Sequence, residues 1–269
     1  MTGIKNSPER SFNAGRPLTD DSLFNGGLVC RQYGDGYRFS VDSILAAHFC
    51  RLHGSERVLD LGCGCGIIGL ILAGLHPNLT LVGLELQQDL AGLCAMNISI
   101  NHFQSRGSVI CGDVRKIGCH ISAESFDLVV CNPPYRKIGS GRVNRTGEAA
   151  IARHELKANL DDMLAAAAFS VKNRGTVVFV YPAVRLASLV AGMHGHALAP
   201  GRLQPVYSYP EAEQATLVVV EAVKNGGEGC DLLPPLFIYA GKNMGYSPEM
   251  EKIYAIIPSG HGPKGQGDG

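Results

Sequence analysis

The sequence predicts a doubly wound α/β fold, in which a mostly parallel sheet of seven strands carries helices on both faces. Short, continuously apolar segments alternate along the chain with longer segments whose apolar residues recur at helical spacing. Strands that lack a polar face and are joined through helices are typical of a parallel sheet covered on both sides. The chain has 269 residues, of which 45% are hydrophobic, so it can bury the core that this arrangement needs.

The first half of the pattern begins with a helix. Apolar residues at helical spacing over residues 40–53, with Asp42 in the first turn, predict it. The apolar run 57–62 is the first strand, and it leads through a glycine-rich turn into a helix at 67–75. The next elements are expected at 80–85 (strand), 87–101 (helix) and 108–111 (strand).

The second half continues the alternation of strands and helices. The apolar strand 126–131 stops at a pair of prolines, which cannot continue a strand ladder. An alanine-rich helix is expected at 160–171, and Pro182 suits the first turn of a helix over 182–194. The remaining strands are expected at 175–181, 206–207 and 215–223, with 236–239 as a further candidate.

The ends of the chain differ from this core. Residues 1–17 are polar and residues 258–269 are glycine-rich, so both ends are predicted to be flexible. Residues 18–257 are predicted to form one domain, with a short leading segment at 18–55. Neither a secretory signal nor an apolar run of membrane-spanning length is visible, which predicts a cytoplasmic protein that does not bind a membrane.

The charge balance and the cysteine content argue against some kinds of partner and site. Basic and acidic residues number 24 each, so no global field drives the chain onto a polyanion. The nine cysteines include no C-x-x-C pair, so neither a metal site nor a redox dithiol is predicted. Cys63 and Cys65 are interpreted as small residues between turn glycines. The oligomeric state is not indicated by any pattern.

The glycine-rich turn after the first strand is the first candidate for a ligand site. Gly62, Gly64 and Gly66 permit a left-handed backbone and the close approach of a ligand. Gly64-x-Gly66-x-x-Gly69 also matches the dinucleotide fingerprint, and Glu85 lies 19 residues beyond Gly66. A carboxylate there suits the ribose of either NAD or S-adenosylmethionine, so the turn leaves both cofactors open.

Two further acids favour S-adenosylmethionine. Asp60 stands at the strand end directly before the glycines, where a carboxylate can receive the ammonium of a methionine moiety and would repel a pyrophosphate. Asp113 follows the third strand and can accept a hydrogen bond from an adenine amino group. Either acid could instead cap a helix. Because Asp60, Glu85 and Asp113 follow three successive strands, a cofactor cradle is favoured.

The tetrapeptide Asn132-Pro133-Pro134-Tyr135 follows the fourth strand and indicates the reaction. A conjugated amino group is a poor nucleophile because its lone pair is delocalised. The Asn132 side-chain oxygen and the Pro133 carbonyl can accept its two hydrogens and draw the nitrogen towards tetrahedral geometry. The prolines stiffen the loop, and Tyr135 can stack on a flat substrate. The alternative is that the tetrapeptide is only a rigid turn. Because the tetrapeptide follows the strand next to the predicted cofactor cradle, methyl transfer to a planar amino nitrogen is favoured.

At these residues the chain resembles the amino-methyltransferases with an N-P-P-Y motif, and within them the tRNA(Val) adenine-N6 methyltransferases. The resemblance extends from about Thr19 to Ile257. The turn and the tetrapeptide occur in many methyltransferases, and the other stretches are more discriminating. The stretches that carry the resemblance are 32–42 (QYGDGYRFSVD), 60–66 (DLGCGCG), 132–135 (NPPY), 152–155 (ARHE), 209–212 (YPEA), 233–236 (LPPL), Tyr239 and 246–249 (YSPE).

The resemblance implies a Rossmann-like methyltransferase fold, S-adenosylmethionine as cofactor and the anticodon-loop adenine of tRNA(Val) as substrate. It implies these roles: Asp60, Gly62, Gly64 and Gly66 for the methionine end, Glu85 for the ribose, Asp113 for the adenine, Asn132 to Tyr135 for the target base beside the cofactor, and Gln32, Arg38 and Asp42 for closing the cofactor pocket. One departure is Arg136, where members of the family often carry an aromatic residue.

A basic stretch follows the tetrapeptide. Residues 136–154 contain one acid, Glu148, and five basic residues. The basic residues are predicted to hold RNA phosphates, and they are Arg136, Lys137, Arg142, Arg145 and Arg153. A solvated loop is the alternative interpretation of such a charge run.

Four other functions remain as alternatives. Two share the chemistry, namely methylation of a protein glutamine and methylation of N2 of a guanine in rRNA. About 50 residues precede the first strand, too few for the separate helical domain expected of the glutamine enzymes. The other two are a non-catalytic S-adenosylmethionine- or RNA-binding module, against which the intact tetrapeptide argues, and an NAD dehydrogenase. The sequence therefore favours adenine-N6 methylation of tRNA.

Overall fold

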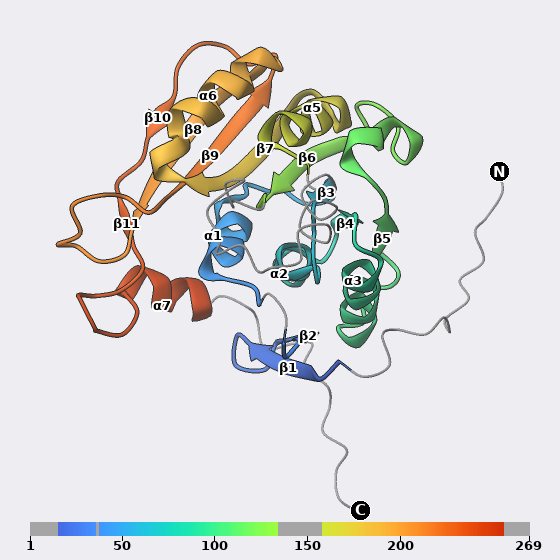
Figure 1. Ribbon diagram of the computed structural model, residues 1–269, viewed down its shortest axis with the longest axis horizontal. Coiled ribbons are helices and arrows are strands. Elements are labelled where there is room, and N and C mark those ends of the chain that lie inside the picture. The colour runs from blue at the N-terminus through green and yellow to red at the C-terminus, as the bar shows by residue number, and fades with distance from the viewer. Residues whose placement is uncertain (1–15, 36–37, 134–157, 256–269) are drawn as a thin grey trace, which may run out of the picture.

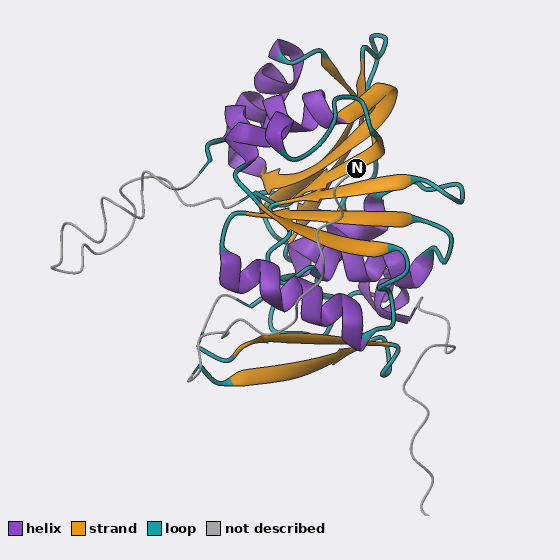
Figure 2. Ribbon diagram, turned by 90° about the vertical axis from the view of Figure 1, so that its right-hand side faces the viewer, coloured by secondary structure: helices purple, strands orange, loops and turns teal. Residues whose placement is uncertain are grey.

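The computed structural model describes residues 16–35, 38–133 and 158–255, and it confirms the predicted α/β fold. A nine-stranded sheet lies between two layers of helices (Figures 1 and 2). Its strands are β3 (Arg57–Leu61), β4 (Thr80–Glu85), β5 (Gly107–Cys111), β6 (Phe126–Cys131), β7 (Val171–Pro182), β8 (Leu198–Tyr207), β9 (Leu217–Lys224), β10 (Asp231–Leu232) and β11 (Leu236–Phe237).

The strand order is β10-β8-β9-β7-β6-β3-β4-β5, with β11 also paired to β8. Strands β5, β4, β3, β6 and β7 are parallel, and β9 runs antiparallel between β7 and β8. The seven long strands are the seven predicted ones, and the two-residue strands β10 and β11 add to them along β8. Because the chain leaves β3 for β4 on one side and returns to β6 on the other, the switch in strand order lies at β3.

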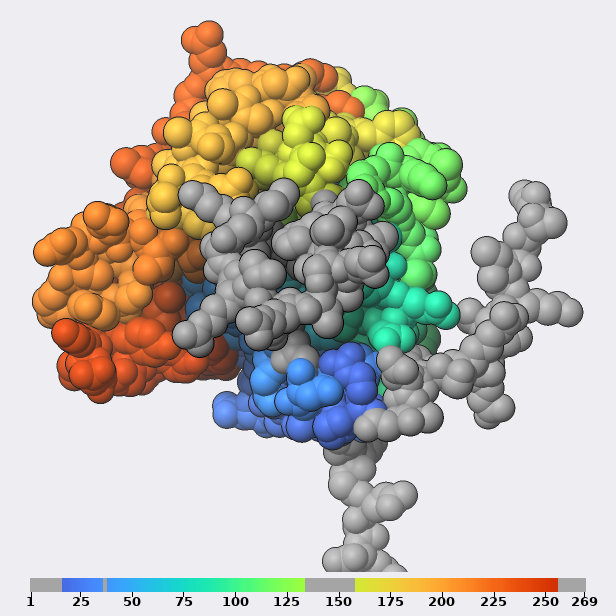
Figure 3. Space-filling model, in the orientation of Figure 1, coloured from blue at the N-terminus to red at the C-terminus, as the bar shows by residue number. Residues whose placement is uncertain are grey.

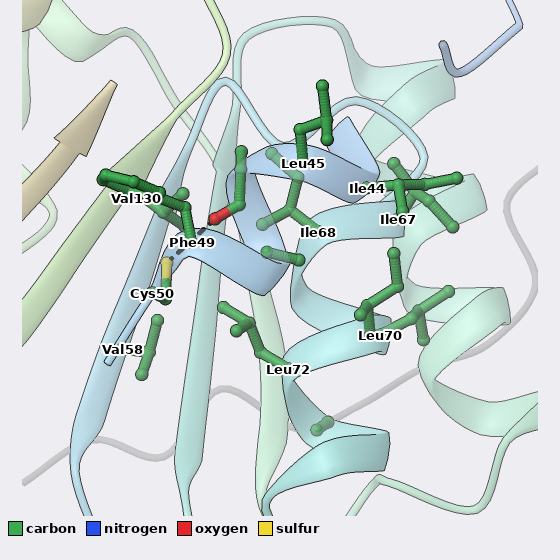
Figure 4. Packing of buried hydrophobic residues seen from close by; sticks show 14 of the residues in the cluster. Ile44, Leu45, Phe49, Cys50, Val58, Ile67, Ile68, Leu70, Leu72 and Val130 are labelled. Carbon is green, nitrogen blue, oxygen red and sulfur yellow. Dashed lines mark hydrogen bonds between the residues drawn. The ribbon is translucent and has the colours of Figure 1, made fainter. Parts of the chain in front are cut away.

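The helices divide between the two faces of the sheet. Helices α1 (Val41–Phe49), α2 (Ile67–Leu75) and α3 (Gln88–Ile100) cover one face, and α5 (Leu160–Ser170) and α6 (Leu186–Gly195) cover the other (labelled in Figure 1; the two layers are seen in Figure 2). Figure 4 shows the first core, in which Ile44 and Leu45 of α1 and Ile68 of α2 pack beside Val58 and Val130 of the sheet. A second core lies beneath α5 and α6.

A hairpin that the sequence did not predict lies outside the first helical layer. Strands β1 (Leu18–Leu23) and β2 (Leu28–Tyr33) pair antiparallel, and a tight turn closes them, with Gly27 N donating to Phe24 O at 3.0 Å. Figure 3 shows the hairpin, in blue, beside the red C-terminal segment, and the rings of Phe24 and Tyr254 lie 6.2 Å apart. The hairpin belongs to the leading segment 18–55, of which only helical structure was predicted.

Two asparagines of α3 attach this hairpin to the helical layer. Asn101 accepts from Val29 N at 3.0 Å and donates to Val29 O at 2.7 Å. Asn97 accepts from Arg31 N at 2.8 Å and donates to Arg31 O at 3.0 Å. Four residues of helix rise about 6 Å and two strand residues span about 6.7 Å, so the two amides match alternate residues of β2. We call this arrangement the amide ladder.

Three other differences from the predicted elements have local causes. Strand β8 begins at Leu198, whereas the sequence predicts its start at residue 206. The first half was missed because Pro200 and Pro205 interrupt the apolar pattern, and the strand accommodates Pro200 next to a bulge. The helix predicted at 182–194 is divided into a short 3-10 turn, η2 (Ala183–Arg185), and α6. A final helix, α7 (Pro248–Ala255), was not predicted, since only Met250 among its residues is buried.

The predicted tail 258–269 and most of residues 1–17 lie outside the described residues, so the flexible ends stay a prediction, as does the single domain. Among the helices that the structure describes, none combines the length and the apolar character needed to cross a bilayer.

Candidate active site

The residues predicted to form the site lie at the carboxyl edge of the sheet. Leu61, at the end of β3, pairs with Leu84 of β4 and with Cys131 of β6. The ends of these strands and the residues that directly follow them therefore lie side by side, which brings the glycine turn, Glu85 and Asn132 to the switch point. This is the place at which open α/β sheets bind their ligands.

The glycine turn has the left-handed backbone that the sequence predicts. The φ angles are +70° at Gly62, +57° at Gly64 and +90° at Gly66. Gly62 N donates to Leu84 O at 2.8 Å, and Gly64 N donates to Glu85 Oε2 at 3.0 Å, so the turn is fixed to the end of β4. A Cβ atom at Gly64 would meet no described atom within 4 Å, so this side of the turn has room for a ligand.

Of the three glycines of the turn, Gly66 should tolerate substitution least. A Cβ atom there would lie 2.6 Å from Cys94 Sγ, on a backbone with φ of +90°. We expect Gly66→Ala to lower the free energy of unfolding by about 1–3 kcal/mol, as measured by urea denaturation. The control is Gly195→Ala, because that glycine ends α6 with open space around it. A loss as large in the control as at Gly66 would show that the turn is not the cause.

Asp60 is buried at the end of β3, with 1% of its surface exposed. Its Oδ2 accepts from Gly69 N at 3.2 Å and so caps the first turn of α2. Its Oδ1 is also buried and has no hydrogen-bond partner among the described residues. Burial, together with a smaller contribution from the nearby Glu85, raises the pKa of this carboxyl to about 7. A cationic ligand would compensate this buried oxygen.

Glu85 is also held in place by backbone donors. Its Oε2 accepts from Gly64 N at 3.0 Å and its Oε1 accepts from Gln87 N at 2.8 Å. Only 7% of the residue is exposed, so its position is well defined. Each carboxylate oxygen has a further lone pair, so Glu85 can accept two hydroxyl groups, as the predicted contact with a ribose requires.

Asp113 serves as a helix cap, the alternative that the sequence left open. Its Oδ1 accepts from Arg115 N at 2.9 Å at the start of the 3-10 helix η1 (Val114–Cys119). The Arg115 guanidinium also pairs with it at 2.7 Å and lowers the pKa of the carboxyl. A contact with adenine stays a prediction, and it would require Asp113 to share its oxygens with Arg115.

The residues predicted to close the pocket are organised by Asp21 of β1, which sequence reasoning missed. Gln32 and Arg38 both donate to the Asp21 carboxylate. Gln32 Oε1 accepts from Phe39 N at 2.8 Å, which fixes the approach to α1. Asp42 follows in the first turn of α1, where burial raises its pKa. Contacts of Gln32, Arg38 and Asp42 with a cofactor stay predictions.

Asn132 has a partner that the sequence did not reveal. Its Nδ2 donates to Ser43 Oγ of α1 at 3.1 Å, across 89 positions of the chain. Ser43 is buried. Because the amide nitrogen is bound to Ser43, the orientation of the whole amide group is set by α1. A serine within the buried, otherwise apolar side of α1 was the one available signal for this role.

The other predicted residues of this region lie outside the described part of the chain, apart from Pro133, which is buried. Those outside are Pro134, Tyr135, Arg136, Lys137, Arg142, Arg145 and Arg153. Their roles stay predictions. Over residues 16–35, 38–133 and 158–255, no group of three or more histidines, cysteines or acids is placed to hold a metal ion.

The donor set fits S-adenosylmethionine. Asp60 offers a buried, unpartnered carboxylate oxygen to an ammonium group, and Glu85 offers acceptors to a ribose. The open side of Gly64 allows the ligand to approach the backbone. A pyrophosphate would be repelled by the ionised form of Asp60. When bound, S-adenosylmethionine supplies an electrophilic methyl group on a sulfonium.

Comparison with known proteins agrees with this geometry. The model of the family "Methyltransferase small domain" matches residues 41–180. A protein of Aliivibrio salmonicida is 23% identical over 68% of this chain and 76% of its own length. A protein of Bacteroides thetaiotaomicron is 26% identical over 72% of this chain and 79% of its own length. One of Shewanella halifaxensis is 28% identical, but the chain covers only 62% of it. All three are named tRNA1(Val) (adenine(37)-N6)-methyltransferase.

Solved structures show the same fold. A predicted O-methyltransferase from Agrobacterium tumefaciens superposes with a TM-score of 0.64 at 19% identity, over 79% of this chain and 95% of that one. TrmN from Thermus thermophilus superposes with a TM-score of 0.51 at 19% identity, over 74% of this chain and 50% of that one.

The family match includes the glycine turn, Glu85 and Asn132, and it contradicts the dinucleotide interpretation of the turn. The predicted fold, enzyme class and methyl donor are confirmed. The chain belongs to the Methyltransferase small domain family and is an S-adenosylmethionine-dependent methyltransferase.

Proposed function

We propose that this enzyme transfers the methyl group to N6 of an adenine in tRNA, namely adenine 37 of tRNA1(Val), for which its curated relatives are named. The observation that carries the proposal is the hydrogen bond of 3.1 Å between Asn132 Nδ2 and Ser43 Oγ. With the amide nitrogen directed at α1, the amide oxygen is directed away from Ser43. An acceptor in this position is what a conjugated amino group requires.

The proposed chemistry needs two acceptors and no strong base. Asn132 Oδ1 and the Pro133 carbonyl accept the two hydrogens of the amino group, and the nitrogen lone pair is then directed at the cradle. Both acceptors are held before the substrate arrives, since α1 orients one and the proline ring stiffens the other. After transfer, one acceptor holds the proton that the nitrogen then loses to water.

Three further points belong to the proposal. Arg136, Lys137, Arg142, Arg145 and Arg153 would hold phosphates of the RNA, which a chain with 24 basic and 24 acidic residues must bind through a local patch. Tyr135 would stack on the target base. The enzyme would work in the cytoplasm, where its tRNA substrate is found.

The test uses the purified protein, labelled S-adenosylmethionine and an unmodified tRNA1(Val) transcript, followed by nucleoside analysis. We expect N6-methyladenosine in this transcript and none in a control transcript that carries guanine in place of adenine 37. Parallel reactions supply rRNA or a protein extract in place of the transcript. Label that enters rRNA guanine or protein glutamine, with none in the tRNA1(Val) transcript, would contradict the proposed substrate.

The role of Ser43 gives a separate prediction. Ser43→Ala should lower kcat by about 3–10-fold, the equivalent of one neutral hydrogen bond, because the Asn132 amide loses its orientation. The dissociation constant for S-adenosylmethionine should stay within about twofold, since Ser43 is not part of the cradle. Single-turnover kinetics and calorimetry measure the two quantities. Ser43→Thr keeps the hydroxyl and should restore most of the rate; an equal loss in both variants would mean that packing, and not the hydrogen bond, matters.

A further inference from the structure

Two cysteines lie in contact beside the glycine turn. Cys30 of β2 is fully buried, and Cys65, between Gly64 and Gly66, is partly exposed. Their sulfur atoms are 3.7 Å apart, although 35 positions separate them in the chain. The sequence predicted no redox dithiol because it contains no C-x-x-C pair, and the hairpin that brings Cys30 to the turn was not foreseen.

One side chain holds both segments in this position. Asn97 Nδ2 donates to Cys65 O at 2.9 Å and to Arg31 O at 3.0 Å, and it lies 3.8 Å from Cys30 Sγ. Asn97 of the amide ladder therefore holds the two sulfur atoms in contact, because it is bound both to the strand that carries Cys30 and to the turn that carries Cys65.

The two thiols differ in reactivity. The hydrogen bond with the Cys30 thiol and a hydrogen bond from Ile67 N at the start of α2 lower the pKa of Cys65, against the opposing effect of burial. The Cys65 hydrogen bond and burial raise the pKa of Cys30. A second pair, Cys63 and Cys94, is buried, and contact with Cys94 together with burial raises the pKa of Cys63. Cys65, the more exposed of the two, is the thiol that an oxidant reaches first, and Cys30, in contact with it at 3.7 Å, is positioned to resolve it.

We propose that Cys30 and Cys65 form a reversible disulfide when a hydroperoxide oxidises Cys65, and that this disulfide weakens the binding of S-adenosylmethionine. The Cys65 thiolate attacks hydrogen peroxide, the O–O bond breaks, and a sulfenic acid and hydroxide form. The Cys30 thiol then loses its proton, its sulfur bonds to Cys65 Sγ, and the S–O bond breaks to release water. Both sulfurs are oxidised, and one peroxide is reduced.

The disulfide would act on the cofactor through the turn. An S–S bond of about 2.05 Å requires the two sulfurs to approach by roughly 1.7 Å. Cys65 has a left-handed glycine on each side, and Gly64 N holds Glu85, so the movement displaces the ribose contact. We expect at least a tenfold loss of affinity. Bound cofactor should in turn slow the oxidation of Cys65.

The experiment treats the full-length protein with hydrogen peroxide and maps disulfides by mass spectrometry. We expect one bond, between Cys30 and Cys65, in the wild type and in the control Cys94→Ala. Cys30→Ala, which alters no residue of the cradle, should form no disulfide and should accumulate a Cys65 sulfenic acid that dimedone traps.

Calorimetry then compares S-adenosylmethionine binding to the reduced, oxidised and re-reduced wild type. The proposal expects the affinity to fall by at least tenfold on oxidation and to return with dithiothreitol. It is overturned if Cys65 stays unmodified, if the bond links Cys63 to Cys94, or if the disulfide form binds the cofactor as tightly as the reduced form.

Discussion

Asn132→Ala is expected to lower the rate of methyl transfer by about 10²–10³-fold, the usual effect of removing one hydrogen-bond partner that acts mainly in the transition state. The amide oxygen that the variant lacks is the one that α1 orients through Ser43. The affinity for S-adenosylmethionine should stay within about twofold, because Asp60 and Glu85 are predicted to provide the principal polar contacts to the cofactor.

Single-turnover kinetics on the tRNA transcript and calorimetry with S-adenosylmethionine test this separation. The control is Asn173→Ala, which removes an exposed asparagine near the start of β7, at the opposite edge of the sheet. That variant should behave as the wild type. If cofactor affinity collapsed together with the rate in Asn132→Ala, Asn132 would be a structural residue of the cradle and not a catalytic one.

Asp60→Asn should weaken the binding of S-adenosylmethionine by at least tenfold and make the ligand-free protein more stable above neutral pH. Burial raises the pKa of Asp60 to about 7 from 3.8. Between these two values the folded protein binds more protons than the unfolded chain, so the free energy of unfolding falls as pH rises. The ionised group costs up to about 4 kcal/mol at pH 8, and asparagine removes this cost while it can still accept from Gly69 N.

Urea denaturation of both proteins between pH 4 and pH 8 measures the effect. The difference in unfolding free energy should grow with pH in favour of the variant, whereas a constant difference would contradict a raised pKa. Cofactor binding gives a second readout: an ammonium beside Asp60 favours the ionised form, so binding near pH 7, where about half of the carboxyls are protonated, should release about half a proton per protein. Calorimetry in buffers of different ionisation enthalpy detects this proton, and the variant should release less.

The parallel core was predictable from the sequence because its strands are continuously apolar. The same reasoning failed for β1, where Asp20 and Asp21 interrupt any apolar pattern and the strand is held mainly by its partner. It failed for the first half of β8 because Pro200 and Pro205 are typical of loops. In both cases long-range packing overrides the local signal.

The site was predictable to the extent that it follows strand ends. Asp60, Glu85 and Asn132 were predicted in this way, and the structure brings them to one edge of the sheet. Asp113 shows the limit, since an acid after a strand can equally cap the next helix. Pairs such as Ser43 with Asn132, or Cys30 with Cys65, depend on which helix and which hairpin face the turn. The sequence shows at most that Ser43 is a polar residue among the apolar residues of α1, and it does not show the partner of either residue.

The amide ladder has a consequence for self-association. A two-stranded hairpin on a protein surface has two open edges, and each can recruit a strand from another chain. Asn97 and Asn101 occupy hydrogen-bonding groups along β2, so this edge is already closed by side chains of the same molecule. The acidic residues Asp20 and Asp21 lie on β1, where charge discourages a further strand. Loss of both asparagines would therefore leave a template for aggregation on an otherwise protected surface.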